Sequence, residues 1–303
     1  MEKPRITVIT LAYRKYDKLA RTIKSIFAQD YKNFEYIISD DGSTNYDEDY
    51  IRGLIPTNRD DIDVVIMHHK ENVGTVENFN KAIEKTTGKY IIVASADDEL
   101  YNSKVISSIV ERFVQHNADI VTTKRAFIDP KSKQIIESPT KERQLILKNG
   151  NSDEIFEELC ISSFISGSCT AYSKRIIEKY KGFDTHYRLI EDFPFYARAV
   201  LDGVKIDFLD IISIYYGIDG VTSGKSNVSV QLMNDRKLFY QRIIFPQLKK
   251  MTYLTRKEIM FRYYRICCKD EKVKYLLGMV KSFDIITLLV VRKIKKKFGN
   301  NKI

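Results

Sequence analysis

The first half of the chain alternates two patterns of apolar residues. Short β-branched runs predict buried strands at 5–13, 34–39, 63–67, 90–95 and 119–127. Between them, residues 17–27, 75–85 and 102–115 carry apolar side chains at helical spacing. Strands that alternate with helices predict βαβ units and a mainly parallel sheet flanked by helices, which is an α/β fold.

The second half is less regular. Residues 128–150 are polar and are expected to form loops, whereas 153–159, 174–180 and 192–201 fit helices. Strands are expected at 166–172 and 204–216. From about residue 231 the pattern is helical, and Thr255 and Glu258 have the spacing of a capping box. The last segment, 271–298, has an apolar centre at 283–291 and a basic end.

Charge divides the chain into two parts. The net charge is +10, but residues 1–225 hold 31 Lys/Arg and 35 Asp/Glu, a net of −4, and residues 226–303 hold 19 and 5, a net of +14. A basic appendage on a mildly acidic body indicates an anionic surface as partner rather than nucleic acid. We therefore expect a helical basic region at 226–303 that contacts an anionic membrane through 271–303.

Cysteine usage and hydropathy indicate a cytoplasmic protein at the inner face of the membrane. Cys160, Cys169, Cys267 and Cys268 lack metal-binding spacing and are expected to be reduced. The amino-terminal apolar run is short and fits a strand rather than a signal peptide. No run reaches the roughly 18 apolar residues that a spanning helix needs.

Two acidic pairs directly follow predicted strands. Ligands of α/β sheets bind at these carboxyl ends of the strands. Asp97 and Asp98 repel each other at a strand end, and a bound Mn²⁺ or Mg²⁺ would relieve the repulsion. Such a cation would stabilise a departing diphosphate. Asp40 and Asp41 precede a glycine turn, where a carboxylate could bind a base N–H or a ribose. Each pair also fits an ordinary turn or helix cap.

Three further polar groups are candidates for chemistry. Asn72, Gly74 and Asn80 suggest a loop and helix close to a ligand, or else an ordinary loop and a surface residue. Glu191 and Asp192 open a predicted helix, where a carboxylate could act as general base or simply cap the helix. The positive helix end is expected to keep Asp192 ionised.

The order of these motifs resembles a family 2 glycosyltransferase of the GT-A fold. The resemblance runs from residue 6 to about 223 and rests on three blocks. These are a strand, a helix and Q-x-Y-x-x-F-E…D-D-G-S at 8–44, N-x-G…N…G-x-Y-I…D-D at 72–98, and G-F-D…E-D…R…G at 182–203.

The resemblance implies inverting transfer from a nucleotide-diphosphate sugar, with a UDP-sugar favoured, to a glycan or lipid-linked acceptor in bacterial surface polysaccharide synthesis. It implies a catalytic domain at 1–225, with a nucleotide-sugar half at 1–127 and an acceptor half at 128–225. Asp98 matches the metal ligand, Asp192 the base and Glu191 its neighbour. The donor-binding matches are Thr10, Ala12, Tyr13, Asp40, Asp41, Asn72, Gly74, Asn80 and Asp97. The acceptor-side positions are Phe164, Gly167, Ser168, Tyr187 and Arg188.

Three positions depart from the family pattern. The first strand runs on without the usual Pro and Asn, and Ser95 stands where relatives often carry an extra Asp. The stretch 215–223 lacks the usual basic residue or His, so Lys225 is the candidate for the diphosphate contact. The interpretation requires that an ion can reach Asp98 and that Asp192 lies on the same side of the molecule.

Two other classes of protein compete with this interpretation. A nucleotidyl- or phosphotransferase would also use paired carboxylates and a metal, but it should carry a glycine-rich phosphate loop after the first strand. Residues 11–16 contain no glycine. A non-catalytic protein that binds nucleotide or nucleic acid could use the basic tail. That charge lies beside an aliphatic stripe, and no nucleic-acid motif is present, so we expect no nucleic acid as partner.

Overall fold

The computed structural model describes residues 3–14, 16–59, 61–129, 134–215, 230–269 and 271–287. Within them, nine strands form one sheet in the order β3-β2-β1-β4-β8-β6-β9-β5, with β7 paired to β6. The strands are β1 (Ile6–Ala12), β2 (Phe34–Asp40), β3 (Val64–His68), β4 (Tyr90–Ser95), β5 (Glu99–Leu100), β6 (Ile120–Ile128), β7 (Ile135–Ser138), β8 (Thr170–Ser173) and β9 (Ile206–Tyr215).

The sheet has a parallel half and a mixed half. Strands β1 to β4 are all parallel, as the alternating pattern predicts. Beyond β4, strand β8 runs antiparallel to both of its neighbours, whereas β6 and β9 are parallel. The carboxyl ends of β1, β2 and β4 therefore meet at one edge, where the acidic pairs lie.

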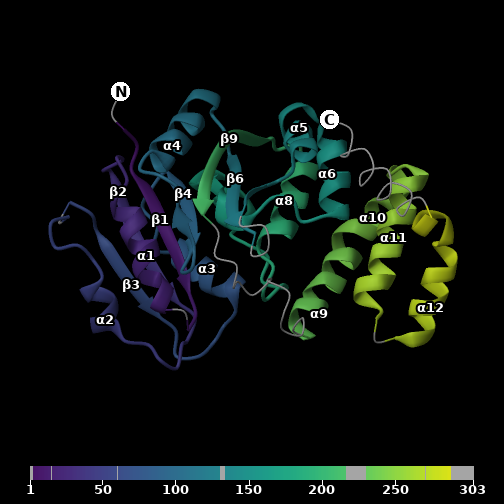
Figure 1. Ribbon diagram of the computed structural model, residues 1–303, viewed down its shortest axis with the longest axis horizontal. Helices are drawn as coiled ribbons and strands as arrows, with labels where there is room; N and C mark the ends of the chain where they lie inside the picture. The colour runs from purple at the N-terminus through teal and green to yellow at the C-terminus, as the bar shows by residue number, and fades with distance from the viewer. Residues whose placement is uncertain are drawn as a thin grey trace.

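Helices cover both faces of the sheet (Figure 1). On one face α1 (Tyr16–Phe27) and α4 (Val105–His116) pack on Val8, Ile38 and Ile92. The opposite face carries Ile9, Ile37 and Ile91. On it lie α3 (Thr75–Ile83), α6 (Ser152–Ile161), α7 (Lys174–Tyr180) and α8 (Asp192–Leu201). The strands are apolar on both sides because both faces are covered.

Two helices occupy stretches without a helical prediction. Helix α2 (Glu48–Gly53) begins at Asp47, whose side chain accepts a hydrogen bond from the Tyr50 amide. Helix α5 (Lys141–Asn149) lies in the segment expected to be loop, and Leu147 is its buried apolar anchor. The loop prediction for 128–150 was therefore wrong for α5 and also for β7.

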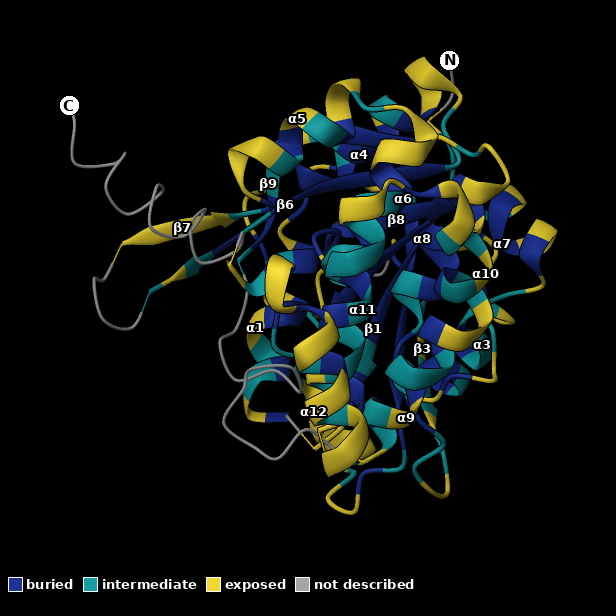
Figure 2. Cartoon of the chain, turned by 90° about the vertical axis from the view of Figure 1, so that its right-hand side faces the viewer, coloured by how far each residue is buried: buried dark blue, intermediate teal, exposed yellow. Residues whose placement is uncertain are grey.

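The carboxy-terminal region is helical and packs partly on the body. It comprises α9 (Val230–Phe239), a π-helical turn (Tyr240–Ile244), α10 (Phe245–Gln247), α11 (Tyr253–Cys267) and α12 (Lys272–Lys281). Leu232, Ile244 and Ile259 are buried in the core that α6 and α8 share. Figure 2 shows α9 largely covered and α12 largely exposed.

The predicted capping box at the start of α11 was wrong. The cap is Thr252, whose Oγ1 accepts the Thr255 amide at 3.2 Å. Thr255 thus lies inside the first turn, and its own hydroxyl donates to Glu157 on α6. The helix starts two residues after Met251, which is buried.

All four cysteines are free and buried. Among the described residues, no helix has the length and apolarity to cross a membrane. Lys225 and the basic stretch 292–297 lie outside the described residues.

Candidate active site

Asp40 ends β2 and is held by four hydrogen bonds. Its carboxylate accepts from the Tyr16 hydroxyl at 2.6 Å and from the Ser43 amide and hydroxyl at 2.8 and 2.6 Å. The Nδ1 atom of His68 lies 2.8 Å from Oδ1. The side chain is fully buried, so it fixes the turn after β2. Donor binding by Asp40 stays a prediction, and these contacts show a structural use of the carboxylate.

Asp41 joins two loops at the same edge of the sheet. Its carboxylate accepts the Val73 amide at 2.7 Å, the Gly74 amide at 3.1 Å and the Asn72 side-chain amide at 2.8 Å. Burial raises the pKa of Asp41 although these donors oppose the shift. The predicted donor residues Asp41, Asn72 and Gly74 therefore form one connected unit.

Arg188, which lies between α7 and α8, contacts this unit through its side chain. Its Nη2 donates to the backbone and side-chain oxygens of Asn72 at 2.6 and 2.8 Å. Gly74 has φ +95°, and a Cβ there would lie 2.5 Å from the Arg188 Cγ. Glycine is needed at this position because the backbone is left-handed and Arg188 leaves no space. Arg188, predicted on the acceptor side, thus contacts the donor loop.

The other predicted donor residues differ in access. Thr10 is buried and its hydroxyl accepts from Tyr36 at 2.8 Å, and Ala12 is buried too. Tyr13 is 36% exposed. Asn80 uses its amide on the backbone of Phe183, donating to the carbonyl at 2.9 Å and accepting the amide at 2.8 Å. Among these four, Tyr13 has the most exposed side chain.

Asp98 lies just past β4, with its side chain fully buried. Its Oδ2 accepts the Ser95 amide at 3.3 Å, and its Oδ1 has no hydrogen-bond partner among the described residues. Burial raises the pKa of Asp98 to about 7, and the neighbouring charge of Asp97 adds to the rise. A buried carboxylate oxygen without a donor is a feature that calls for a cation or a proton.

The two carboxylates fit a divalent cation. Mg²⁺ and Mn²⁺ prefer carboxylate oxygen, and Mg²⁺ is commonly bound by one or two carboxylates together with substrate phosphates. In the described part of the chain no three His, Cys, Asp or Glu side chains cluster as a metal site, so metal binding by Asp98, with Asp97 beside it, stays a prediction. Asp98 is fully buried, so the structure as it stands does not meet the requirement that an ion can reach it, and a cation would need neighbouring residues to move.

Glu191 and Asp192 lie at the start of α8. The Asp192 Oδ1 accepts the Phe193 amide at 2.9 Å. A Cβ on Gly167 would lie 3.0 Å from the Glu191 Oε1 and 3.4 Å from the Asp192 Oδ2, so only a small residue fits there. Burial raises the pKa of both carboxyls, and the charge of Asp192 raises that of Glu191 further. At Asp192 burial outweighs the backbone donors at the helix start, so its pKa is raised, and the expectation that Asp192 stays ionised remains a prediction.

One short turn brings the metal and base candidates together. In the 3₁₀ turn Gly167–Cys169, Gly167 lies against Asp192, and the Ser168 hydroxyl opposes the rise in the pKa of Asp98. Arg125 on β6 opposes the rise in the pKa of both Asp98 and Asp192, which burial causes. Asp98 and Asp192, 94 positions apart in the sequence, therefore lie on the same side of the molecule.

The acceptor-side predictions divide into two groups. Gly167 and Ser168 lie between the carboxylates, as just described. Phe164 and Tyr187 are 3% and 2% exposed and belong to the hydrophobic core. Contact with an acceptor stays a prediction for all of them, and the burial of Phe164 and Tyr187 favours a packing role.

Sequence reasoning missed Arg125 and Asp235. Arg125 is a charged residue inside a predicted buried strand, and that conflict was a usable signal. Asp235 on α9 is 1% exposed and contacts the segment before Glu191. It is the single acidic residue between 226 and 257 in a basic region, which was a weaker signal.

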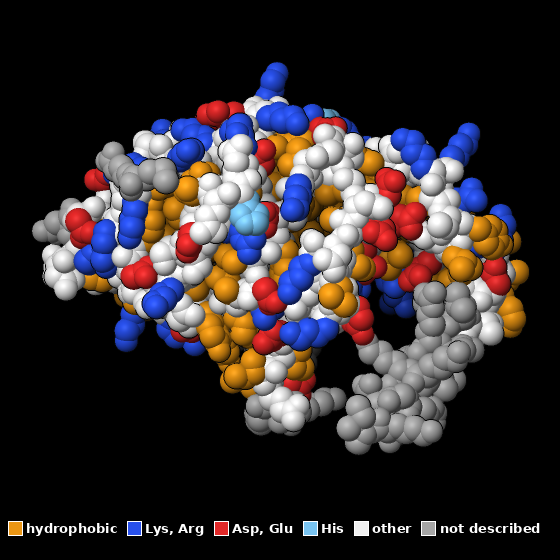
Figure 3. Space-filling view, turned by 90° about the horizontal axis from the view of Figure 1, so that it is seen from above, with side chains coloured by type: hydrophobic (Ala, Val, Ile, Leu, Met, Phe, Trp, Pro, Cys, Tyr) orange, Lys and Arg blue, Asp and Glu red, His pale blue; other side chains and the backbone are white. Residues whose placement is uncertain are grey.

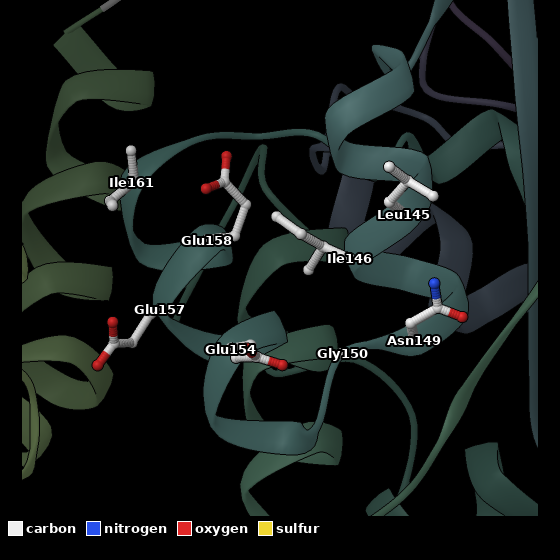
Figure 4. A pocket seen from close by; sticks show the side chains of 8 residues that line it. All are labelled: Leu145, Ile146, Asn149, Gly150, Glu154, Glu157, Glu158 and Ile161. Atoms are coloured by element: carbon white, nitrogen blue, oxygen red, sulfur yellow. The ribbon is translucent and has the colours of Figure 1, made fainter.

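A separate groove lies between α5 and α6 (Figure 4). It measures about 480 Å³ and none of the candidate residues lines it. Its acidic side chains are used in the fold, since Glu154 caps α6, Glu158 pairs with Arg143, and Glu157 accepts from Thr255. The groove is therefore not part of the candidate active site.

Comparison with solved structures defines the class of fold. The mannosyltransferase PcManGT from Pyrobaculum calidifontis, solved with GDP-Man and Mn²⁺, matches 97% of this chain and 81% of its own, with a TM-score of 0.62 and 13% identity. TarS 1–349 of S. aureus, solved with UDP-GlcNAc, matches 92% and 88%, with a TM-score of 0.58 and 15% identity. The fold is that of GT-A glycosyltransferases.

A family model described as glycosyl transferase family 2 matches residues 7–181. The chain belongs to this family and is a glycosyltransferase. An uncharacterized glycosyltransferase of Nostoc sp. is 29% identical over 242 residues, which are 77% of this chain and 70% of the relative. The putative colanic acid biosynthesis glycosyl transferase WcaA of Escherichia coli is 26% identical over 204 residues, 66% and 67% of the two chains. Family membership favours sugar transfer over the two alternative classes.

Proposed function

We propose that this chain is an inverting, metal-dependent glycosyltransferase that moves a sugar from a nucleotide-diphosphate donor to an acceptor hydroxyl. The observation that carries the proposal is the turn Gly167–Cys169, with Asp98 beside Ser168 and Asp192 beside Gly167. This neighbourhood supports a role for Asp98 at the diphosphate and for Asp192 as the proton acceptor of the same reaction. Transfer with inversion needs the proton acceptor on the side of the anomeric carbon opposite the departing diphosphate.

Asp192 is the general base in this proposal. As the acceptor oxygen attacks the anomeric carbon, its proton passes to the Asp192 carboxylate and the bond to the diphosphate breaks. A single displacement of this kind inverts the anomeric centre. Burial, which raises the pKa of Asp192, makes the carboxylate a better proton acceptor. The Phe193 amide holds Oδ1, so the carboxylate keeps one orientation.

Asp97 and Asp98 would hold Mn²⁺ or Mg²⁺. When bound, the cation neutralises charge on the departing diphosphate. Arg125 is a second source of positive charge near Asp98 and Asp192. The Mn²⁺ in the PcManGT structure supports this assignment by analogy of fold.

The donor unit of Asp41, Asn72 and Gly74 would bind the nucleotide. The similar structures contain UDP-GlcNAc and GDP-Man, and we favour a UDP-sugar. The relatives WcaA and TuaG are named for colanic acid and teichuronic acid biosynthesis, and TuaG of Bacillus subtilis is 30% identical over 34% of this chain. These names support a glycan or lipid-linked acceptor in surface polysaccharide synthesis.

A thermal-shift screen tests the donor. Ligands that bind the native state raise the melting temperature by mass action. We expect a UDP-sugar, added with Mn²⁺, to give the largest rise among nucleotide diphosphates and nucleotide sugars, and the rise to shrink with EDTA. The absence of any shift with every nucleotide sugar tested, at millimolar concentration with Mn²⁺, would contradict the proposal.

We also propose that the enzyme lies at the cytoplasmic face of an anionic membrane. One face of α12 and the residues after it exposes apolar side chains at helical spacing, each 55% exposed or more: Val273, Leu276, Leu277, Val280 and Phe283. Lys272, Lys274 and Lys281 are exposed beside them. Figure 3 shows hydrophobic and basic side chains together at the end of the molecule where α11 and α12 lie. Apolar insertion flanked by lysines suits an anionic bilayer.

Vesicle sedimentation tests this placement. The protein is expected to sediment with vesicles of phosphatidylglycerol and to stay in the supernatant with phosphatidylcholine. Leu276→Asp with Val280→Asp should abolish the binding, as should deletion of 271–303. Leu145→Asp, which changes a similarly exposed leucine on α5, is the matched control and should leave it intact. Equal sedimentation of the α12 variant and wild type would refute the assignment.

A further inference from the structure

Asp235 is a buried carboxylate that holds the backbone at Arg188 and Leu189. It lies on α9 and is 1% exposed. Its Oδ2 accepts the amides of Arg188 and Leu189 at 2.9 and 2.6 Å, and its Oδ1 accepts the Gln231 side-chain amide at 2.8 Å. Hydrogen bonds from three donors balance the cost of burying this carboxylate.

The segment that Asp235 holds connects both parts of the candidate active site. Three residues after Leu189 the chain reaches Asp192, and the intervening Ile190 is buried. On the other side, the Arg188 carbonyl accepts the Val76 amide at the start of α3. The Arg188 side chain holds Asn72 in the donor loop.

We propose that Asp235 is a positioning residue, through which helix α9 of the carboxy-terminal region forms part of the active site. The carboxylate fixes the backbone at 188–189, and this segment sets the place of Asp192. The inference rests on the proposed role of Asp192 as general base. A displacement of about 1 Å in a reacting group can cost about 100-fold in rate, so the anchor matters for turnover.

Donor binding depends less on this anchor than turnover does. The donor loop is also held by three donors to Asp41, which do not involve the segment 188–189. The segment that leads to Asp192 has its side-chain anchor in Asp235. Loss of the carboxylate should therefore lower kcat more than it weakens donor affinity.

The test compares substitutions at Asp235 in the full chain. Asp235→Ala removes all three acceptor contacts. Asp235→Ser is the second variant, because its hydroxyl is too short to reach both amides yet it keeps a polar group and leaves room for water. Asp235→Asn keeps an oxygen for the two amides, and Gln231 can turn its own oxygen toward the new amide. Lys237→Ala, which breaks the ion pair from α9 to Glu271, is the matched control.

Turnover and donor affinity are measured well below the melting temperature of each variant, with UDP and Mn²⁺ titrated by calorimetry. We expect kcat to fall about 10- to 100-fold in the Ala and Ser variants, in line with a displaced base. Donor affinity should change less, Asp235→Asn should recover most of the turnover, and Lys237→Ala should match wild type. Wild-type kcat in the Ala or Ser variant, or an equal loss in Lys237→Ala, overturns the inference.

Asp192→Asn in the same assay separates this inference from the proposed function. Near-normal turnover of Asp192→Asn overturns the assigned base, and the positioning role with it. Loss of turnover in Asp192→Asn together with normal turnover in Asp235→Ala overturns the positioning role alone.

Discussion

At the scale of one residue, the proposed metal ligand Asp98 is a carboxylate whose burial has a cost. A carboxylate buried next to Asp97, with one oxygen lacking a donor among the residues that the structure describes, is unfavourable as an anion in the protein alone. The same features make the oxygen a good ligand for a hard cation. The cost to stability and the proposed use in metal binding would then have a common origin.

The raised pKa of Asp98 predicts a pH dependence for metal-assisted nucleotide binding. Burial raises this pKa to about 7, so below pH 7 a proton occupies the carboxyl and must leave before a cation binds. We expect the rise in melting temperature caused by UDP with Mn²⁺ to be larger at pH 8 than at pH 6. The rise with UDP and EDTA is the control and should vary less with pH. A larger Mn²⁺ effect at pH 6 would contradict this account.

At the scale of elements, Glu35 ties the parallel half of the sheet together. It lies on β2 and its carboxylate accepts from the Thr7 hydroxyl of β1 at 2.5 Å. It also accepts from the amide and hydroxyl of Thr87, before β4, at 2.5 and 2.8 Å. The side chain is buried, and although burial alone would raise its pKa, these hydrogen bonds lower it below the usual 4.5.

Glu35→Gln is predicted to destabilise the protein. An amide keeps the shape but offers an NH₂ group to donors, and an unsatisfied buried polar contact costs about 1–3 kcal/mol. Urea unfolding at pH 7 measures the loss. Because the folded pKa is lowered, the wild-type advantage is full above pH 4.5 and is lost as pH falls through the folded value. An equal difference between the two proteins at pH 7 and well below pH 4.5 would argue against the carboxylate as its source.

The elements that sequence pattern predicts well are those with strong periodicity. Strands β1, β2 and β4 are buried along their length, and helix α1 buries one face against the sheet. Their sequence patterns are strong because burial in the core requires apolar residues at these positions. Helix α5 buries little besides Leu147 and Gln144, and its pattern is correspondingly weak. The direction of β8 depends on which neighbours it pairs with, and residue order does not contain that information.

At the scale of the whole molecule, the site is built from distant parts of the chain. Ordered motifs predicted that Asp98 and Asp192 would share a site, and the turn Gly167–Cys169 brings them together. The supports could not be predicted in the same way. Arg125 and Asp235 act through contacts with residues tens of positions away, and single-residue patterns do not encode such pairs.

The central claim is that Asp98 and Asp192 serve one reaction in different roles. The most direct test measures UDP binding with Mn²⁺ by calorimetry, and transfer from the donor identified in the screen, for Asp98→Asn and Asp192→Asn. We predict that both variants lose about 100-fold or more in turnover, as expected on loss of a metal contact or a general base. Asp98→Asn should also lose the Mn²⁺-dependent part of nucleotide binding, whereas Asp192→Asn should keep it. Near-wild-type turnover in either variant, or loss of nucleotide binding in Asp192→Asn alone, would contradict the account.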